Sequence, residues 1–122
     1  MSLVQIIQIR TRNLKTFLKL LNPEKFQTKF RIDGSSNYAF NLILKNQDYE
    51  FANNLIKTLT SKGIEFRRGS AGGGNQLRQP YLKDYVLKDE YKNFPVTEHI
   101  HFFGFYLGNY PDMTVQDVEQ LV

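Results

Sequence analysis

Three stretches of the chain repeat apolar residues with the period of an α-helix. The longest runs from about Leu3 to Leu21, with apolar residues three, four or seven positions apart and basic residues between them. The second follows Asn46, which we expect to cap it, and ends at Gly63, which suits the left-handed residue after a helix. The third follows Thr114, an expected N-cap. The pattern therefore predicts three amphipathic helices.

Other stretches alternate apolar residues with period two, which indicates strands. From Tyr38 to Leu44 one face is aromatic and aliphatic, and the other face is also partly apolar. Because both faces are apolar, we expect this strand to be central in its sheet. Residues 64–66 predict a short second strand, and 103–108 predict a third in which glycines leave room for close packing.

The order of these elements predicts the fold class. A short helix is expected to open near Pro95 or Thr97, and residues 82–92 receive no assignment. The series helix, strand, helix, strand, loop, helix, strand, helix predicts an α+β fold. We expect a two-layer domain, with helices packed on a small, mostly antiparallel sheet of about three strands. With 122 residues, 41% of them apolar, the chain can build one core, so residues 1–122 are expected to form one domain.

Charge and cysteine content narrow the function classes. Sixteen Lys and Arg against twelve Asp and Glu give a net charge of +4, which permits an anionic ligand but is weak for a nucleic-acid binder. The absence of cysteine excludes disulfides, thiolate metal sites and a cysteine nucleophile, and it fits a reducing cytosol. No apolar run approaches the ~20 residues of a membrane span. We therefore expect a cytoplasmic protein whose partners include neither membrane nor nucleic acid.

The segment RRGSAGGGNQLRQPY, residues 67–81, is the strongest candidate for ligand binding. Consecutive glycines let backbone N–H groups converge on an anion, and the amides and guanidinium that follow suit hydroxyls and phosphates. The string matches neither a Walker A loop nor a dinucleotide fingerprint, so a flexible connection over 69–75 is the alternative interpretation. The residues we expect to contact a polar or anionic ligand are Gly72, Gly73, Gly74, Asn75, Arg78 and Gln79.

The remaining polar residues predict no reaction. On a strand, His99 and His101 would face the same way and could share a metal, but no third ligand lies at a suitable spacing, so packing or surface roles are favoured. Asp112, Asp117 and Glu119 are interpreted as charges at a helix N-terminus. No nucleophile has a base near it in the sequence. We therefore expect neither catalytic nor metal-binding residues in this chain.

Two longer strings resemble a known family. KGIEFRRGSAGGGNQLRQPY and FPVTEHIHFFGFYLGNYPDMTVQDVEQLV resemble the C-terminal small domain of DegT-type enzymes. These are pyridoxal-phosphate-dependent nucleotide-sugar aminotransferases and 3-dehydratases of the fold-type I aminotransferase superfamily. The resemblance runs from about Leu3 to Val122, and GNQLRQPY looks closest to the sugar 3-dehydratases. The glycine run is longer than the short Ala-Gly-Asn of the family string.

The resemblance implies a substrate-side small domain of a longer, homodimeric enzyme. Family substrates are nucleotide-diphospho-4-keto-6-deoxysugars, used in lipopolysaccharide and other surface glycans. The large domain would bind pyridoxal phosphate (PLP), and its lysine, or a histidine in some dehydratases, would decide the reaction. This sequence lacks the large-domain motifs, so the fragment is expected to bind no cofactor and to be inactive alone.

By the same resemblance, Asn75, Arg78 and Gln79 would face the sugar or its diphosphate, and glycines 72–74 would let the backbone approach it. The alternative is a stand-alone module that binds an anionic ligand or nucleic acid without catalysis.

Overall fold

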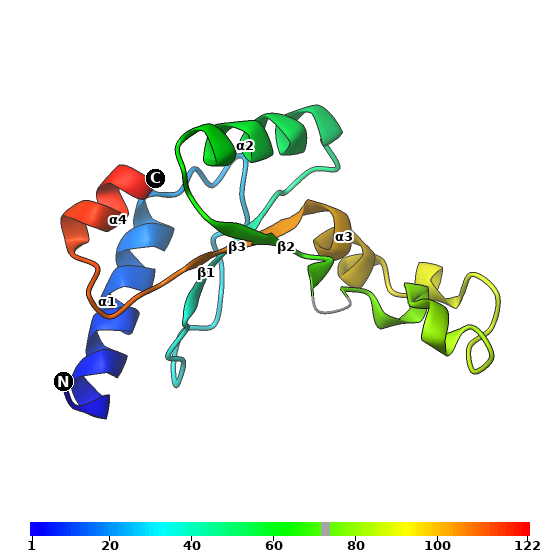
Figure 1. Ribbon diagram of the computed structural model, residues 1–122, viewed down its shortest axis with the longest axis horizontal. Helices are drawn as coiled ribbons and strands as arrows, with labels where there is room; N and C mark the ends of the chain where they lie inside the picture. The colour runs from blue at the N-terminus through cyan, green and yellow to red at the C-terminus, as the bar shows by residue number, and fades with distance from the viewer. Residues whose placement is uncertain (72–73) are drawn as a thin grey trace.

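The computed structural model describes residues 1–71 and 74–122. Helices and strands follow one another in the predicted order (Figure 1). The helices are α1 (Leu3–Leu20), α2 (Tyr49–Ser61), α3 (Pro95–Phe103) and α4 (Val115–Leu121). The strands are β1 (Ala39–Ile43), β2 (Phe66–Arg68) and β3 (Gly104–Gly108). The predicted α+β class is confirmed. Among the described residues, no helix is both long and apolar enough to cross a membrane.

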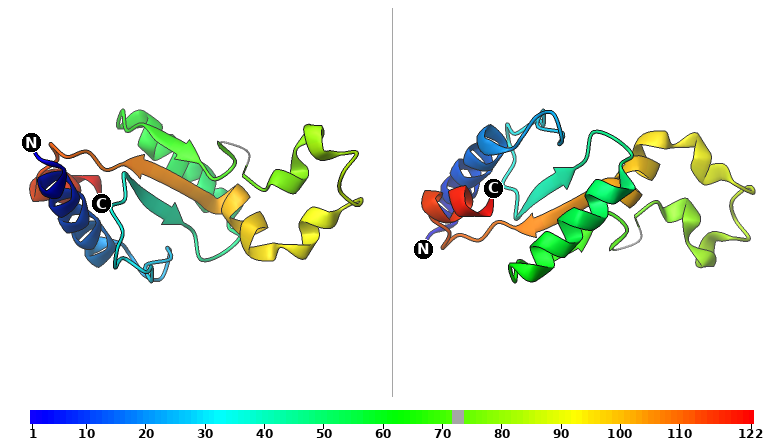
Figure 2. Two further views of the ribbon diagram at one scale, coloured as in Figure 1. Left: turned by 90° about the horizontal axis from the view of Figure 1, so that it is seen from below. Right: turned by 90° about the horizontal axis from the view of Figure 1, so that it is seen from above.

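The three strands form one antiparallel sheet in the order β1-β3-β2. Leu107 of the central strand β3 lies opposite Phe40 of β1 and Phe66 of β2. Helix α2 covers one face of the sheet, while α1 and α4 pack side by side at one end (Figures 1 and 2). No helix of the described residues covers the other face (Figure 2).

The hydrophobic core lies between the sheet and its helices. Phe17 of α1 stacks on Phe40 of β1, with ring centroids 4.5 Å apart, and both side chains are buried. Ala52 and Leu59 of α2 and Val118 of α4 belong to the same cluster. The apolar stripes read from the sequence therefore meet in a single core.

Strand β1 lies at an edge of the sheet, which corrects the prediction of a central position. Apolar residues on both faces of a strand report what lies above and below it, not what pairs beside it. The outer edge of β1 is partly covered by the connection from α1. Phe26 bridges to Leu44, and the Gln27 N–H donates to the carbonyl of Ile43 at 2.7 Å.

Two element boundaries also differ from the prediction. Asp48, not Asn46, caps α2, because its carboxylate accepts the backbone N–H of Phe51 at 2.9 Å. The second strand begins at Phe66, two residues later than expected. Gly63 has the predicted left-handed conformation, with φ of 69°.

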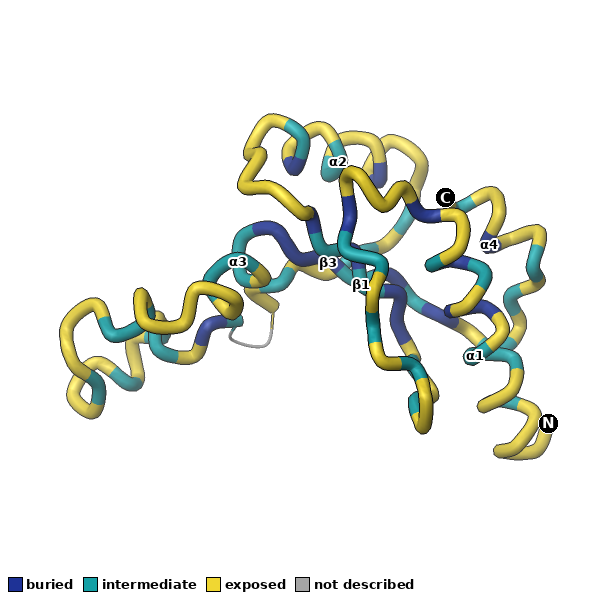
Figure 3. The backbone as a smooth tube through the Cα atoms, turned by 180° about the vertical axis from the view of Figure 1, so that it is seen from behind, coloured by how far each residue is buried: buried dark blue, intermediate teal, exposed yellow. Residues whose placement is uncertain are grey.

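Residues 75–94, called the arm from here on, extend away from the sheet beyond α3 (Figure 1). The arm contains the 3-10 turns η2 (Gln76–Arg78), η3 (Pro80–Leu82) and η4 (Glu90–Asn93). Most of it is exposed or half-buried, with Asn75 at its root as the buried exception (Figure 3). Three of the candidate binding residues, Asn75, Arg78 and Gln79, therefore lie on a projection of the fold and not on the sheet.

Candidate functional site

Asn75 fastens the root of the arm to α3. Its side chain is 2% exposed and donates from Nδ2 to Glu98 Oε1 at 2.7 Å. Its Oδ1 accepts the N–H of Leu77 at 3.2 Å, which caps η2, and its own backbone N–H donates to His101 Nδ1 at 2.9 Å. The side-chain amide and the backbone N–H of this buried residue are therefore all paired within the fold.

Arg78 forms a forked ion pair with the same carboxylate. Its Nε donates to Glu98 Oε1 at 2.7 Å and to Oε2 at 3.0 Å, and its Nη2 donates to Oε2 at 2.8 Å. The guanidinium carbon lies 3.9 Å from the ring centroid of Tyr91 and 4.9 Å from that of Phe102. Charge-assisted pairing and ring contact together fix the plane of the guanidinium.

The ion pair keeps both partners charged. The hydrogen bond from Arg78 lowers the pKa of Glu98 against the opposing effect of burial, and the Asn75 hydrogen bond lowers it further. In turn the Glu98 hydrogen bond raises the pKa of Arg78. Carboxylate and guanidinium therefore stay ionised across the neutral pH range.

Two glycines allow the loop before the arm to lie close to α3. A Cβ on Gly69 would overlap the backbone carbonyl of Ile100, and a Cβ on Gly74 would overlap the ring of His101. Gly74 also has a positive φ of 52°. These positions require glycine for packing and conformation. Gly72 and Gly73 lie outside the described residues.

Of the predicted ligand-binding residues, the structure brings Asn75 and Arg78 together on Glu98. Gln79 is half-buried where η2 meets η3, and its backbone N–H donates to Gln76 at 3.0 Å. Gly74 lies against the ring of His101. Contact of these residues with a sugar or a diphosphate stays a prediction.

Sequence reasoning missed Glu98 and gave His101 only a packing or surface role. Both lie on the short helix α3, three residues apart, so one helix face presents them to the arm. His99 lies on another face, where its Nε2 contacts the carbonyl of Leu44. The two histidines therefore do not share the orientation that a strand would give them. Among the described residues, no three His, Cys, Asp or Glu side chains gather as metal ligands.

A shallow cleft of about 380 Å³ adjoins Arg78 on the arm. Its cationic residues are Arg78, Lys83 and Lys88, while Asp89 is the single acid among the lining residues. The ring of Tyr91 and aliphatic side chains complete the wall. Such a lining suits an anionic group beside an apolar surface.

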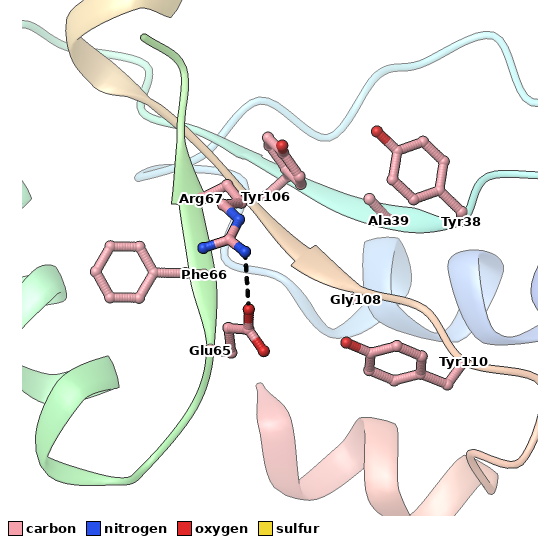
Figure 4. Close-up of a pocket in the computed structure, with 8 residues that line it drawn as sticks. All are labelled: Tyr38, Ala39, Glu65, Phe66, Arg67, Tyr106, Gly108 and Tyr110. Atoms are coloured by element: carbon pink, nitrogen blue, oxygen red, sulfur yellow. Dashed lines mark ion pairs between the residues drawn. The ribbon is translucent and has the colours of Figure 1, made fainter. Parts of the chain in front are cut away.

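A second cleft, of about 260 Å³, lies on the uncovered face of the sheet (Figure 4). Tyr38 and Tyr106 approach edge to face at 6.4 Å, and the Tyr110 ring lies close over Gly108. Arg67 lines the same cleft and pairs with a neighbouring carboxylate at 3.1 Å. This surface is aromatic and partly exposed, with Tyr38 66% accessible.

Neither a protein-family model nor a curated protein matches this sequence. Solved structures do. A GDP-4-keto-6-deoxymannose-3-dehydratase with a trapped PLP-glutamate geminal diamine is 25% identical, with a TM-score of 0.72 over 98% of this chain. The E. coli GDP-4-keto-6-deoxy-D-mannose-3-dehydratase with bound hydrated PLP is 26% identical, with a TM-score of 0.73 over 97%. A variant of the dehydratase ColD with bound GDP-perosamine is 25% identical, with a TM-score of 0.71.

The chain spans only 30–31% of the length of these relatives. The match covers nearly all of this chain, and the matched structures share both its fold and about a quarter of its residues. The resemblance predicted from the sequence is thereby confirmed: these 122 residues resemble the small-domain part of a DegT-type, PLP-dependent GDP-sugar 3-dehydratase.

Proposed function

We propose that residues 1–122 are the substrate-side small domain of a PLP-dependent enzyme acting on a nucleotide-diphospho-4-keto-6-deoxyhexose. The observation that carries the proposal is the match of 97–98% of this chain to 3-dehydratases at TM-scores of 0.71–0.73. The Gln79-Pro80 string after Arg78 supports the 3-dehydratase branch over the aminotransferase branch. A cytoplasmic role in lipopolysaccharide synthesis fits this substrate class.

We propose that residues 1–122 do not bind PLP by themselves. PLP enzymes use a lysine or its replacement at the aldehyde and a carboxylate at the pyridine nitrogen. The carboxylate of Glu98, which lies on α3 beside the arm, is already held by Arg78 and Asn75. We therefore place the cofactor on a large domain and derive no chemical step through it from this chain.

The role of this chain is to hold the substrate. Arg78, with Lys83 and Lys88 beside it, provides donors and positive charge at one cleft. A diphosphate would satisfy both, because charge-assisted bonds to phosphate are short and strong. Glycines 72–74 and Gln79 are proposed to approach the sugar. Closing such a domain over the substrate excludes water and fixes orientation.

The uncovered face of the sheet is the surface we propose to meet the large domain of the same chain. Tyr38 and Tyr110 remain more than half exposed there, and an exposed aromatic patch is typical of a surface that meets a partner. The enzyme as a whole is proposed to be a homodimer, as the resemblance implies.

The test begins with the gene around this chain. The full-length protein is expected to carry a PLP-binding domain upstream. It is also expected to consume GDP-4-keto-6-deoxymannose, and mass spectrometry of the sugar nucleotide measures this reaction. A 3-deoxy product would identify the dehydratase branch, and an amino sugar would identify the aminotransferase branch. A full-length protein that shows no PLP absorbance and leaves the sugar unchanged would refute the proposal.

Arg78→Ala in the full-length protein tests the site. Because Arg78 is assigned to the substrate and not to the cofactor, KM for the nucleotide sugar is expected to rise about tenfold. PLP affinity, followed by absorbance, is expected to stay constant. Arg31→Ala, which removes an exposed arginine from the connection before β1, is the matched control. Loss of PLP affinity with an unchanged KM would contradict the assignment.

The alternative is a stand-alone anion-binding module. Binding experiments on the 122-residue chain alone distinguish it from the proposed function. Tight binding of GDP-perosamine to this chain without a large domain would favour it. Binding to DNA with a steep salt dependence would favour the nucleic-acid version.

A further inference from the structure

Glu98 connects the two arm residues that the sequence assigns to the ligand. It lies in the first turn of α3, and its side chain is 18% exposed. One carboxylate oxygen accepts from both Asn75 Nδ2 and Arg78 Nε, each at 2.7 Å, and the other accepts from Arg78 Nη2 at 2.8 Å. A single side chain thus contacts both residues and helps to fix where they lie.

We propose that Glu98 is a positioning residue, which aims the N–H donors of Arg78 that it does not itself engage at the diphosphate of a nucleotide sugar. This inference rests on the proposed function, because it assumes that such a substrate reaches the arm. It adds a residue whose role neither the sequence nor the comparisons assign.

The geometry leaves Arg78 able to bind a second anion. A guanidinium has five N–H donors, and Glu98 accepts hydrogen bonds from the Nε–H and from one N–H of Nη2. No hydrogen bond from Nη1 to any described residue is found. The side chain is 32% exposed and borders the cleft that contains Lys83 and Lys88. The outer edge of the guanidinium is therefore oriented and accessible.

Orientation and charge predict opposite effects of removing Glu98. The carboxylate offsets the charge of Arg78, so by simple Coulomb attraction its loss would tighten the binding of a diphosphate. Without Glu98, however, Arg78 loses three hydrogen-bond contacts and Asn75 loses one. A freed arginine must then be ordered by the ligand, which weakens binding. The sign of the change separates the two accounts.

The experiment measures Kd for GDP-perosamine and KM and kcat for the keto sugar in the full-length holoenzyme. Glu98→Ala is expected to weaken binding and raise KM about tenfold, with kcat nearly unchanged. Glu98→Gln keeps an acceptor oxygen and is expected to recover part of the loss. Glu119→Gln removes the same charge from exposed α4 and serves as the control.

A double-mutant cycle with Arg78→Ala completes the test. If Glu98 acts through Arg78, adding Glu98→Ala to Arg78→Ala costs much less than Glu98→Ala costs in the wild type. A melting curve of each variant confirms that the domain remains folded.

Unchanged or tighter binding in both Glu98 variants would overturn the positioning role, and so would fully additive losses. If Arg78→Ala weakens binding while the Glu98 variants do not, the positioning role alone fails. If the wild-type holoenzyme binds no GDP-perosamine, the proposed function fails and the inference falls with it.

Discussion

At the scale of single residues, two buried asparagines join segments that are far apart in the chain. Asn13 and Asn109 are fully buried, and Asn13 Nδ2 donates to Asn109 Oδ1 at 3.3 Å. Asn109 Nδ2 donates to the carbonyls of Arg10 and Asn37, each at 3.0 Å. These bonds join α1, the connection before β1 and the turn after β3. Nothing in the local sequence pattern indicates them.

Replacing Asn109 with alanine is expected to destabilise the fold by about 2 kcal/mol, because it removes two hydrogen bonds to backbone carbonyls and takes an acceptor from the buried amide of Asn13. Urea unfolding of the 122-residue chain measures this free energy. Asn53→Ala, on the exposed face of α2, is the matched control and is expected to cost nothing. Equal stabilities of the two variants would show that the buried bonds contribute little.

At the scale of elements, α3 organises the loop and the arm. Pro95, one of the two predicted starts, occupies its first turn, and its last turn approaches Gly69 closely. The N–H of Gly69 donates to the carbonyl of Gly104, where α3 ends and β3 begins. Where the chain leaves β2, Gly69 therefore contacts the backbone of Ile100 and Gly104, which cannot move aside as a flexible side chain could.

Gly69→Ala is expected to destabilise the chain by about 1–3 kcal/mol, because its Cβ meets the rigid carbonyl of Ile100. Gly34→Ala meets no atom within 4 Å and is expected to cost only the left-handed backbone penalty, ~1 kcal/mol. Thermal unfolding of both variants compares the two effects. A smaller loss at Gly69 than at Gly34 would mean that the backbone yields easily there.

The contact between loop and α3 is also expected to depend on pH. Burial lowers the pKa of His101 below its ordinary value of 6.5; Arg78 and Arg68 lower it further, and Glu98 opposes them. The unfolded chain then binds more protons below pH 6.5, so the contact contributes fully above that pH and is lost as pH falls. Protonated Nδ1 cannot accept the Asn75 N–H.

A nuclear magnetic resonance titration checks this dependence. The Asn75 amide proton is expected to move upfield with a midpoint below 6.5. The Asn109 amide, which donates to the carbonyl of Tyr38 at 2.7 Å, is the internal control and should not move. A midpoint above 6.5 would refute the predicted direction of the His101 pKa shift.

At the scale of the whole molecule, helices of the described residues cover one face of the sheet and leave the other face uncovered (Figures 1 and 2). The covered face is packed with helices, whereas the other presents Tyr38, Tyr106 and Tyr110 around a cleft (Figure 4). The arm projects from the same framework (Figure 3). This arrangement fits a domain that works against a partner surface.

Tyr38→Ser is expected to leave the 122-residue chain nearly as stable as the wild type, because the side chain is 66% exposed. In the full-length protein the same change is expected to lower the melting temperature, because it removes the apolar contact between the Tyr38 ring and the large domain. Tyr85→Ser, on the exposed arm, is the control. Equal melting temperatures of the two full-length variants would argue against contact at the uncovered face.

The sequence by itself determined the features that depend on neighbours in the chain. The capping box of Thr114 and Asp117 and the left-handed Gly63 both follow from groups a few residues apart. Element order and fold class follow in turn, because each apolar stripe needs a surface to cover.

The tertiary structure alone decided which distant residues meet. Strand order placed β1 at an edge, since burial above and below a strand does not specify what pairs beside it. Glu98 reaches Arg78 and Asn75 across 20 and 23 residues of chain. Periodicity describes one element at a time, so it cannot predict contacts that depend on the path of the backbone between elements.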